Sequence, residues 1–132
     1  MTKFLLDTCT CISMLRNEGF VRETLRRVGV KNCYISEITV AELYFGVAKA
    51  ENKKRKLEDI EKIQKLFRVI PAYSSFKEYG EIRFTLEHSG MRVDQFDLLI
   101  GATALHHQMT LVTSNIKHFN RIQGINIENW KE

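Results

Sequence analysis

The sequence lacks the features that mark secreted and membrane-spanning proteins. It has no apolar run near the ~20 residues that a membrane helix needs, and no secretory signal is visible at its N-terminus. Its three cysteines, Cys9, Cys11 and Cys33, cannot all pair, and the Cys9–Cys11 spacing is too short for a usual zinc motif. We therefore expect a soluble cytoplasmic protein whose cysteines are reduced and serve as small buried residues.

Prolines, internal repeats and linkers are also scarce. One proline in 132 residues and 44% hydrophobic content predict a single domain, residues 1–132, with one closed core. The formal charge of +4 is mildly basic, which is compatible with a polyanionic partner. Part of this charge lies in two groups, Arg22–Lys31 and Lys53–Lys56, although a solvated helix start or loop is the favoured explanation of the second group.

The spacing of apolar residues predicts strands and helices in alternation. Short strands are expected at residues 3–7, 33–35, 69–70, 110–113 and 125–130. Helices are expected at 11–16, 20–28, 37–50, 76–88 and 94–107, with one more through Leu57–Phe67 and a helical turn at 116–119. This order predicts an α/β fold, a three-layer α/β/α sandwich around a central, mostly parallel sheet.

Polar residues follow several of these strands. Asp7 ends the first strand, Ser36 ends the second, and Thr113-Ser114-Asn115 ends the fourth. Because sites in parallel sheets form beyond the carboxyl ends of the strands, we expect these residues to gather at one edge.

Glu42 is an acid on an otherwise apolar helix face. At about 100° per residue it shares that face with Ile38, Ala41 and Phe45, so we expect Glu42 to point inward or to the margin of the buried stripe. A capping box, Thr39-x-x-Glu42, would also explain it. Ser36 is the better N-cap because it directly follows the strand.

Asp97 is the most informative acid. It shares a helix face with Ile100, Gly101 and Ala104, and the two small residues indicate close packing. With Asp94 as N-cap, the helix dipole alone would explain one carboxylate at Asp97. It does not explain three separated acids that converge.

Converging carboxylates repel each other unless a cation joins them. Oxygen ligands of this kind favour Mg²⁺ or Mn²⁺. Such an ion on a basic domain points to phosphodiester chemistry.

With these acids in place, the chain resembles PIN-domain ribonucleases, specifically VapC-type toxins of bacterial toxin–antitoxin pairs. The matching stretches run in order over nearly the whole chain: FLLDTCTCI, ISEITVAELYFGVAKA, FDLLIGATAL and LVTSNIKHFNRIQGINIENW. The resemblance implies a PIN-like fold in which Asp7, Glu42 and Asp97 are catalytic, with Asp7 and Asp97 binding metal directly and Glu42 directly or through water.

Two departures from the family pattern stand out. The family often has a fourth acid after the fourth strand, where this chain has Asn115, and Asp94 could supply the missing charge. The family usually has Asn or Ser at the position of Cys9, and Thr8 could take over part of its role. Thr113 and Ser114 are further supporting residues, as hydrogen-bond partners of Asp7 or of bound water.

The resemblance also implies an activity and partners: metal-dependent hydrolysis of RNA, with transfer RNA among the candidate substrates, a cognate antitoxin held near the apolar helices that carry Tyr44 and Leu57, and a homodimer. Two other interpretations stay open. One is a catalytically weak PIN-fold module that binds RNA or protein. The other is a haloacid-type phosphatase with Asp7 as nucleophile, which would require an acid where Cys9 stands.

Overall fold

The computed structural model describes all 132 residues and places every strand in one sheet. The strands are β1 (Phe4–Leu6), β2 (Cys33–Ser36), β3 (Arg68–Ile70), β4 (Thr110–Val112) and β5 (Ile127–Glu128). Their order is β3-β2-β1-β4-β5, and each neighbouring pair is parallel. The expected α/β sandwich is confirmed, and its sheet is parallel throughout.

Seven α-helices cover the sheet. They are α1 (Thr8–Leu15), α2 (Val21–Val28), α3 (Glu37–Lys49), α4 (Lys53–Leu66), α5 (Phe76–His88), α6 (Gln95–His106) and α7 (Ile116–Phe119). Two 3-10 turns, Val30–Asn32 and Tyr73–Ser75, complete the chain. The first helix begins earlier than its apolar spacing indicates, because Asp7 accepts the backbone N–H of Thr8 and caps it. No helix is both long and apolar enough to span a lipid bilayer.

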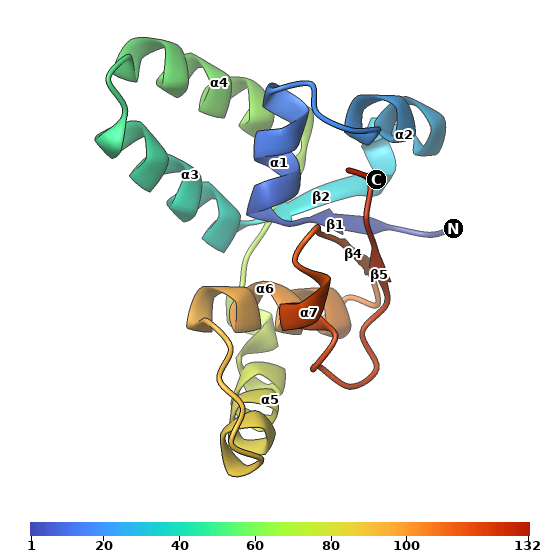
Figure 1. Ribbon diagram of the computed structural model, residues 1–132. Helices are drawn as coiled ribbons and strands as arrows, with labels where there is room; N and C mark the ends of the chain where they lie inside the picture. The colour runs from blue at the N-terminus through green and yellow to red at the C-terminus, as the bar shows by residue number, and fades with distance from the viewer.

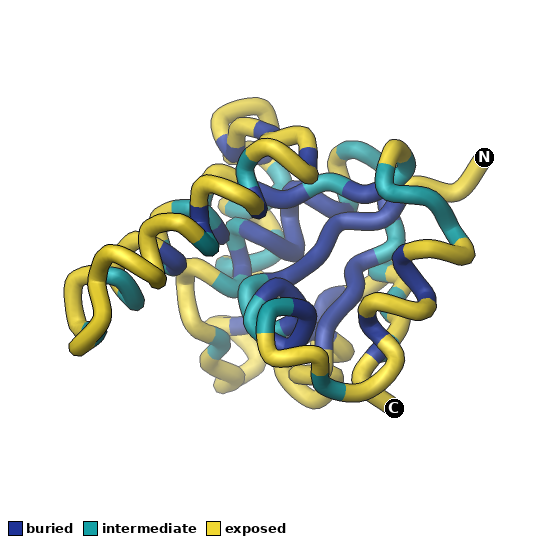
Figure 2. Tube along the Cα trace, turned by 90° about the horizontal axis from the view of Figure 1, so that it is seen from above, coloured by how far each residue is buried: buried dark blue, intermediate teal, exposed yellow.

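The helices divide between the two faces of the sheet (Figure 1). Helices α1 to α4 lie over one face, where Phe4, Leu6 and Ile35 enter the core, and α5 to α7 lie over the other, where Leu5 and Leu111 point. Successive residues of a strand face opposite sides, so β1 alone feeds both cores. Figure 2 shows the result, a buried sheet ringed by exposed helix surfaces.

Helix α3 differs from the sequence-based expectation. Its buried residues are Thr39 and Leu43, whereas Phe45 is 64% exposed and Ala41 is also exposed. The predicted apolar face is therefore wrong as a core face at Ala41 and Phe45, whereas Ile38 is partly buried and packs against the core. Helical spacing identified an apolar stripe, but a stripe can face solvent or a partner as well as the core. Glu42 consequently lies at the margin between the buried and exposed sides.

The strand order places a crevice at the centre of the sheet. The chain winds from β1 outward to β3, then crosses to the other side of β1 to form β4. Strands β2 and β4 thus lie on opposite sides of β1. This reversal of direction opens space at the carboxyl ends of β1 and β4. Asp7 and Thr113 directly follow these two strands.

Gly101 brings α6 close to the segment after β4. A side-chain carbon at this position would lie 2.6 Å from Ile122 and 3.5 Å from Phe119. The predicted close packing of this face is confirmed, with Ile100 and Ala104 fully buried. The same face carries Asp97 one turn earlier, so this packing positions Asp97 beside the crevice.

Candidate metal centre

Asp7 is the most enclosed acid of the chain, with 2% of its surface exposed. Its Oδ1 accepts the N–H of Thr8 at 2.8 Å, and its Oδ2 accepts the hydroxyl of Thr113 at 2.9 Å. Burial raises the pKa of Asp7, and these hydrogen bonds oppose that shift by favouring the ionised form. The carboxylate is thus held in one orientation at the carboxyl edge of the sheet.

Thr8 connects Asp7 to Glu42. Its hydroxyl donates to Glu42 Oε1 at 2.6 Å and lies 3.2 Å from the hydroxyl of the fully buried Thr39. Because Thr8 has one hydroxyl proton, donating it to Glu42 leaves its oxygen to accept from Thr39. Ser36, not Thr39, caps α3, accepting the N–H of Ile38, so the capping-box explanation of Glu42 is wrong.

The start of α6 carries the other two acids. Asp94 is the N-cap, as predicted, and its Oδ1 accepts the N–H groups of Phe96 and Asp97. Asp97 lies in the first turn with 17% of its side chain exposed. Its Oδ2 is 3.6 Å from Nδ1 of the exposed His118 on α7. Unlike Asp7, Asp97 accepts no side-chain hydrogen bond.

The residues after β4 support the same edge. Thr113 accepts the N–H of Asn115 at 3.0 Å while it donates to Asp7. Asn115 and Ser114 are both exposed. Asn115 precedes α7 without capping it through its side chain, and Ser114 contacts the sulfur of Cys9 at 3.4 Å.

Cys9 contacts the polar residues of this edge, which corrects the expectation that it serves only as a small buried residue. Its Sγ lies 3.4 Å from Asp7 Oδ2 and 3.5 Å from the Thr113 hydroxyl. The other two thiols behave as expected: Cys11 and Cys33 are buried in the core, where burial raises the pKa of Cys11 and raises that of Cys33 to about 12. Helix α1 starts at Thr8, and this early start brings Cys9 to the site.

The acids influence each other electrostatically. Burial raises the pKa of Asp97 to about 6, and the charges of Asp7, Asp94 and Glu42 add to the shift. The pKa of Glu42 is also raised, first by burial and then by Asp7 and Asp94, although its hydrogen bond from Thr8 opposes this. The edge of the sheet therefore concentrates negative charge that no lysine or arginine side chain pairs with.

The donor set suits a hard divalent cation. All four acidic side chains offer carboxylate oxygens, and each keeps lone pairs that the described hydrogen bonds do not use. As placed, however, no group of three or more His, Cys, Asp or Glu side chains could hold a metal ion. The chemistry of the residues fits Mg²⁺ or Mn²⁺, whereas direct coordination by three acids at once would need side-chain movement.

A large cavity lies elsewhere. It measures about 630 Å³ and opens at the α5–α6 connection, beside Arg92 and Val93. Its lining includes none of the four acids. Volume alone points away from the acids, whereas the raised pKa values of Asp7, Glu42 and Asp97, each caused first by burial, point to this edge of the sheet as the candidate site.

Sequence reasoning missed the contacts that two residues make with this network. Cys9 stands where the family usually has Asn or Ser, but its contact with Asp7 was not expected because cysteine is a weak hydrogen-bonding group. Thr39 was considered only as a helix cap, although its spacing from Glu42, close to one helical turn, indicates that both can face the same element. A threonine at a core position of an apolar helix was the available signal.

Comparison with known proteins identifies the family. The PIN domain matches residues 4–125. Ribonuclease VapC2 of Rickettsia felis is 34% identical over 131 residues, spanning 96% of this chain and 97% of that protein. The tRNA(fMet)-specific endonuclease VapC of Salmonella typhimurium is 34% identical over 132 residues, spanning 98% of this chain and 99% of that protein.

Solved structures agree in fold. The DNA-bound VapBC structure from Salmonella typhimurium has a TM-score of 0.91 at 32% identity, covering 98% of this chain and 99% of that one. VapBC2 from Rickettsia felis, bound to a DNA fragment of its promoter, has a TM-score of 0.90 at the same identity and coverage. The chain belongs to the PIN-domain family and, within it, to the VapC ribonucleases.

Proposed function

We propose that this chain is a metal-dependent endoribonuclease, the toxin of a toxin–antitoxin pair, and that Mg²⁺ or Mn²⁺ is its cofactor. The observation that carries the proposal is the group of four carboxylates at one edge of the sheet, in which burial and then the charges of Asp7, Asp94 and Glu42 raise the pKa of Asp97. Unneutralised charge of this kind favours cation binding.

Asp7 and Asp97 are the proposed direct ligands. Glu42 contributes directly or through water, and Asp94 adds charge from the α6 N-cap, where one of its oxygens is not used by the cap. A bound divalent ion would lower the pKa of a water molecule and neutralise charge on the phosphate during hydrolysis.

The other residues position these acids. Thr113 and the Thr8 backbone fix the two oxygens of Asp7, while the Thr8 hydroxyl fixes Glu42. Ser114 and Asn115 are exposed beside Thr113 and are available to a bound water or phosphate. The network orders the acids before the substrate arrives, which is the main requirement for electrostatic catalysis.

The proposed substrate is RNA, with transfer RNA the first candidate because a relative of similar length is a tRNA(fMet)-specific endonuclease. A cytoplasmic location follows from that substrate.

A cognate antitoxin is the proposed protein partner, because the structural relatives are VapBC complexes. An apolar cavity of about 310 Å³ between α1, α2 and α4, bordered by Leu15, Leu25 and Leu66, is suited to side chains of such a partner. Co-expression with the product of the neighbouring gene should yield a complex that Leu66→Glu weakens; an unchanged complex would place the antitoxin elsewhere.

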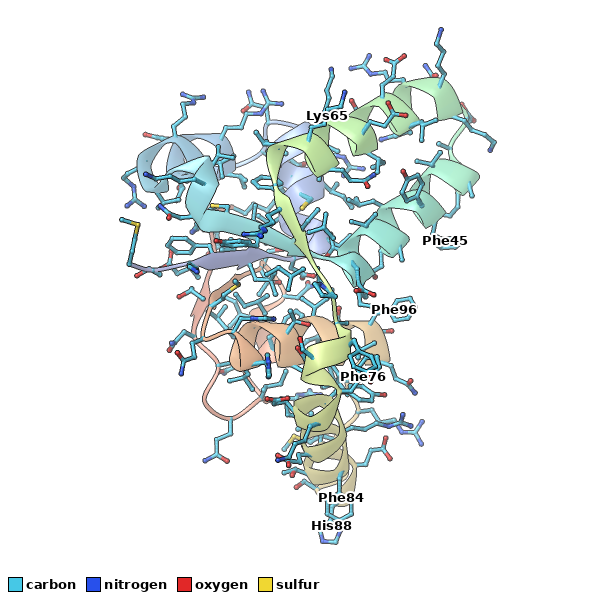
Figure 3. All side chains as sticks on the ribbon, turned by 180° about the vertical axis from the view of Figure 1, so that it is seen from behind. Phe45, Lys65, Phe76, Phe84, His88 and Phe96 are labelled. Atoms are coloured by element: carbon cyan, nitrogen blue, oxygen red, sulfur yellow. The ribbon has the colours of Figure 1, made fainter.

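A second copy of the chain is the proposed partner of another surface. Phe45 on α3, Phe96 on α6 and Phe76 on α5 lie along one side of the molecule (Figure 3) and are 64%, 49% and 51% exposed. Exposed aromatic residues grouped in this way favour association. Phe45→Glu should shift the protein toward monomer in sedimentation, and an unchanged mass would contradict this interface.

The test is an RNA-cleavage assay with three proteins, each with and without chelator. The wild type should cleave bulk transfer RNA only when Mg²⁺ or Mn²⁺ is present. Asp97→Asn should lose about 100-fold or more of this activity, since even outer-shell changes around a metal cost up to that amount. Glu81→Gln, which neutralises an exposed carboxylate on α5, is the matched control and should remain active.

A second readout is independent of cleavage. Mg²⁺ at about 100 times its dissociation constant should stabilise the wild type by about 2.7 kcal/mol. The melting temperature of Asp97→Asn should respond much less. Cleavage that survives both chelator and Asp97→Asn would rule out the metal mechanism.

A catalytically weak RNA-binding module is the second candidate. It is favoured by the thiol of Cys9 against Asp7 and by the uncharged Asn115, which both depart from the expected pattern. Binding of transfer RNA without cleavage at any Mg²⁺ or Mn²⁺ concentration would support it over the nuclease.

A further inference from the structure

The positive charge of the chain is concentrated at one place. Residues 49–56 contain five cations and one acid, a net charge of +4, which equals the net charge of the whole protein. The other residues balance at 15 cations and 15 acids. This segment forms the tip of the α3–α4 hairpin, which projects from the sheet (Figure 1), and residues 51–58 are all exposed. We name residues 49–56 the hairpin tip.

Two of the five cations have structural contacts. Lys53 donates to the carbonyl oxygens of Ala48 and Ala50 at 2.7 and 3.1 Å, which satisfies the end of α3. Lys49 lies 4.6 Å above the ring of Phe45. Lys54, Arg55 and Lys56 take part in none of the ion pairs of the structure, and their side chains donate no hydrogen bond. Their charges have no partner within the chain.

The order of charges along α4 opposes the stability of that helix. Its first turn contains no acid and begins with four consecutive cations, whereas Glu58, Asp59 and Glu61 follow later. The N-terminal end of a helix favours negative charge, and an acid placed before a base stabilises a helix better than the reverse order. The later acids also confine the positive region to the tip. Helix stability therefore does not explain the cations.

The hairpin tip is connected to the acids by a single rigid element. Glu42 and Lys49 both belong to α3, seven residues apart, which corresponds to about 10 Å along the helix axis. The groove beside the tip, about 400 Å³, is lined only by polar residues, including Lys54, Arg55 and the acids Glu58 and Asp59. A polyanion bound at Glu42 would therefore need to extend about 10 Å along α3 to reach Lys49, where the tip begins.

We infer that Lys54, Arg55 and Lys56 bind phosphates of the RNA that flank the bond to be cleaved. This inference rests on the proposed ribonuclease function and adds a substrate contact to it. Cations without partners on an exposed, projecting tip suit the regularly charged RNA backbone, and such contacts position the substrate without reading its sequence. The competing occupant of the tip is an acidic segment of a partner protein. The link through α3 between Glu42 and the tip favours RNA, because only RNA has to contact both places.

The test compares two triple variants that each remove three positive charges. Lys54→Gln/Arg55→Gln/Lys56→Gln changes the tip. Arg16→Gln/Arg27→Gln/Lys31→Gln is the matched control, because these three residues are also exposed and make no side-chain hydrogen bond or ion pair. Binding of bulk transfer RNA is measured in chelator over a series of salt concentrations, and circular dichroism verifies folding.

The tip variant should bind about 10- to 100-fold more weakly at low salt. Its plot of log affinity against log salt should lose about 2 to 3 from its slope, which counts the lost phosphate contacts. The control should change affinity less than about threefold, because only its long-range charge differs. In the cleavage assay, KM should rise for the tip variant while kcat is retained.

Two results would overturn the inference. Equal losses of RNA affinity in both variants would mean that net charge, not the position of the tip, governs binding. Unchanged RNA affinity in the tip variant would mean that these cations do not bind RNA and would favour a protein partner. Either result is distinguishable from failure of the proposed function, because in both cases the wild type would still cleave RNA.

Discussion

The two acidic ends of the proposed metal site are built differently. At the β1–α1 corner, Asp7 is almost fully enclosed and receives hydrogen bonds from a backbone N–H and a hydroxyl. At the start of α6, Asp97 is more exposed and receives none from a side chain; Nδ1 of His118 lies 3.6 Å from its Oδ2. One carboxylate is supported by the protein, and the other is not.

The two carboxylates therefore differ in what acts on them most: hydrogen bonds hold Asp7, whereas burial and neighbouring charges act on Asp97. Hydrogen bonds to Asp7 stabilise its ionised form, so its position is set by folding. The charge of Asp97 is opposed by burial and by three neighbouring acids, which raises its pKa to about 6. A cation should therefore gain the most binding free energy at the α6 end. Without a cation, the charge of Asp97 lowers the stability of the folded protein.

Removing the support of Asp7 should have the largest effect on stability. Thr113→Val keeps the side-chain volume but leaves a buried carboxylate without its hydroxyl donor and the N–H of Asn115 without its acceptor. We expect a loss of about 2–3 kcal/mol in the free energy of unfolding, measured by urea denaturation.

Thr103→Val is the control for this prediction. Thr103 is equally buried on α6, but its hydroxyl donates only to the Leu99 carbonyl of its own helix. We expect its loss to be about 1 kcal/mol or less. Equal losses in the free energy of unfolding of the two variants would show that the contact between Thr113 and Asp7 adds no stability beyond that of an ordinary buried threonine.

Neutralising the unsupported acid should have the opposite sign. In chelator at pH 7, Asp97→Asn should stabilise the protein by about 1–2 kcal/mol, a value that allows for partial solvent screening of this group. Asp94→Asn is the control and should change stability less, because asparagine also caps a helix well. A destabilised Asp97→Asn would contradict the proposed difference between the two ends.

The pH dependence follows from the same shift. The pKa of Asp97 is raised in the folded state from 3.8 to about 6, so between these values the folded protein binds more protons than the unfolded chain. The unfavourable contribution of Asp97 should thus be complete above pH 6 and fade as the pH falls toward 3.8. The stability difference between the wild type and Asp97→Asn should shrink over that window.

Much of this arrangement could be predicted from the sequence. Asp7 after an apolar strand, Ser36 as a helix cap and Asp97 beside Gly101 are each encoded by neighbours in the chain, and a parallel sheet brings strand ends to one edge. The strands and helices follow for the same reason, because the period of apolar residues sets them locally.

The features that could not be predicted depend on contacts between distant residues. Phe45 belongs to an apolar stripe that faces outward, and no local pattern distinguishes a core face from a partner face. The contact between Cys9 and Thr113 joins residues 104 positions apart. It exists because β1 and β4 are neighbours in the sheet, which the sequence alone did not reveal.

Cys9 offers the smallest and most selective change at the supported end. Cys9→Ser replaces a weak donor by a hydroxyl that can donate to Asp7 and accept from Ser114, the contacts that the sulfur makes at 3.4 Å. Because a hydroxyl is smaller, we expect the free energy of unfolding to change by less than about 1 kcal/mol. The Mg²⁺ concentration for half-maximal cleavage should change by up to about tenfold, since Asp7 would gain a stronger hydrogen bond. Cys11→Ser, in the core, should instead lose stability with no change in that Mg²⁺ midpoint. If both variants shift the midpoint equally, the thiol beside Asp7 has no separate influence on the site.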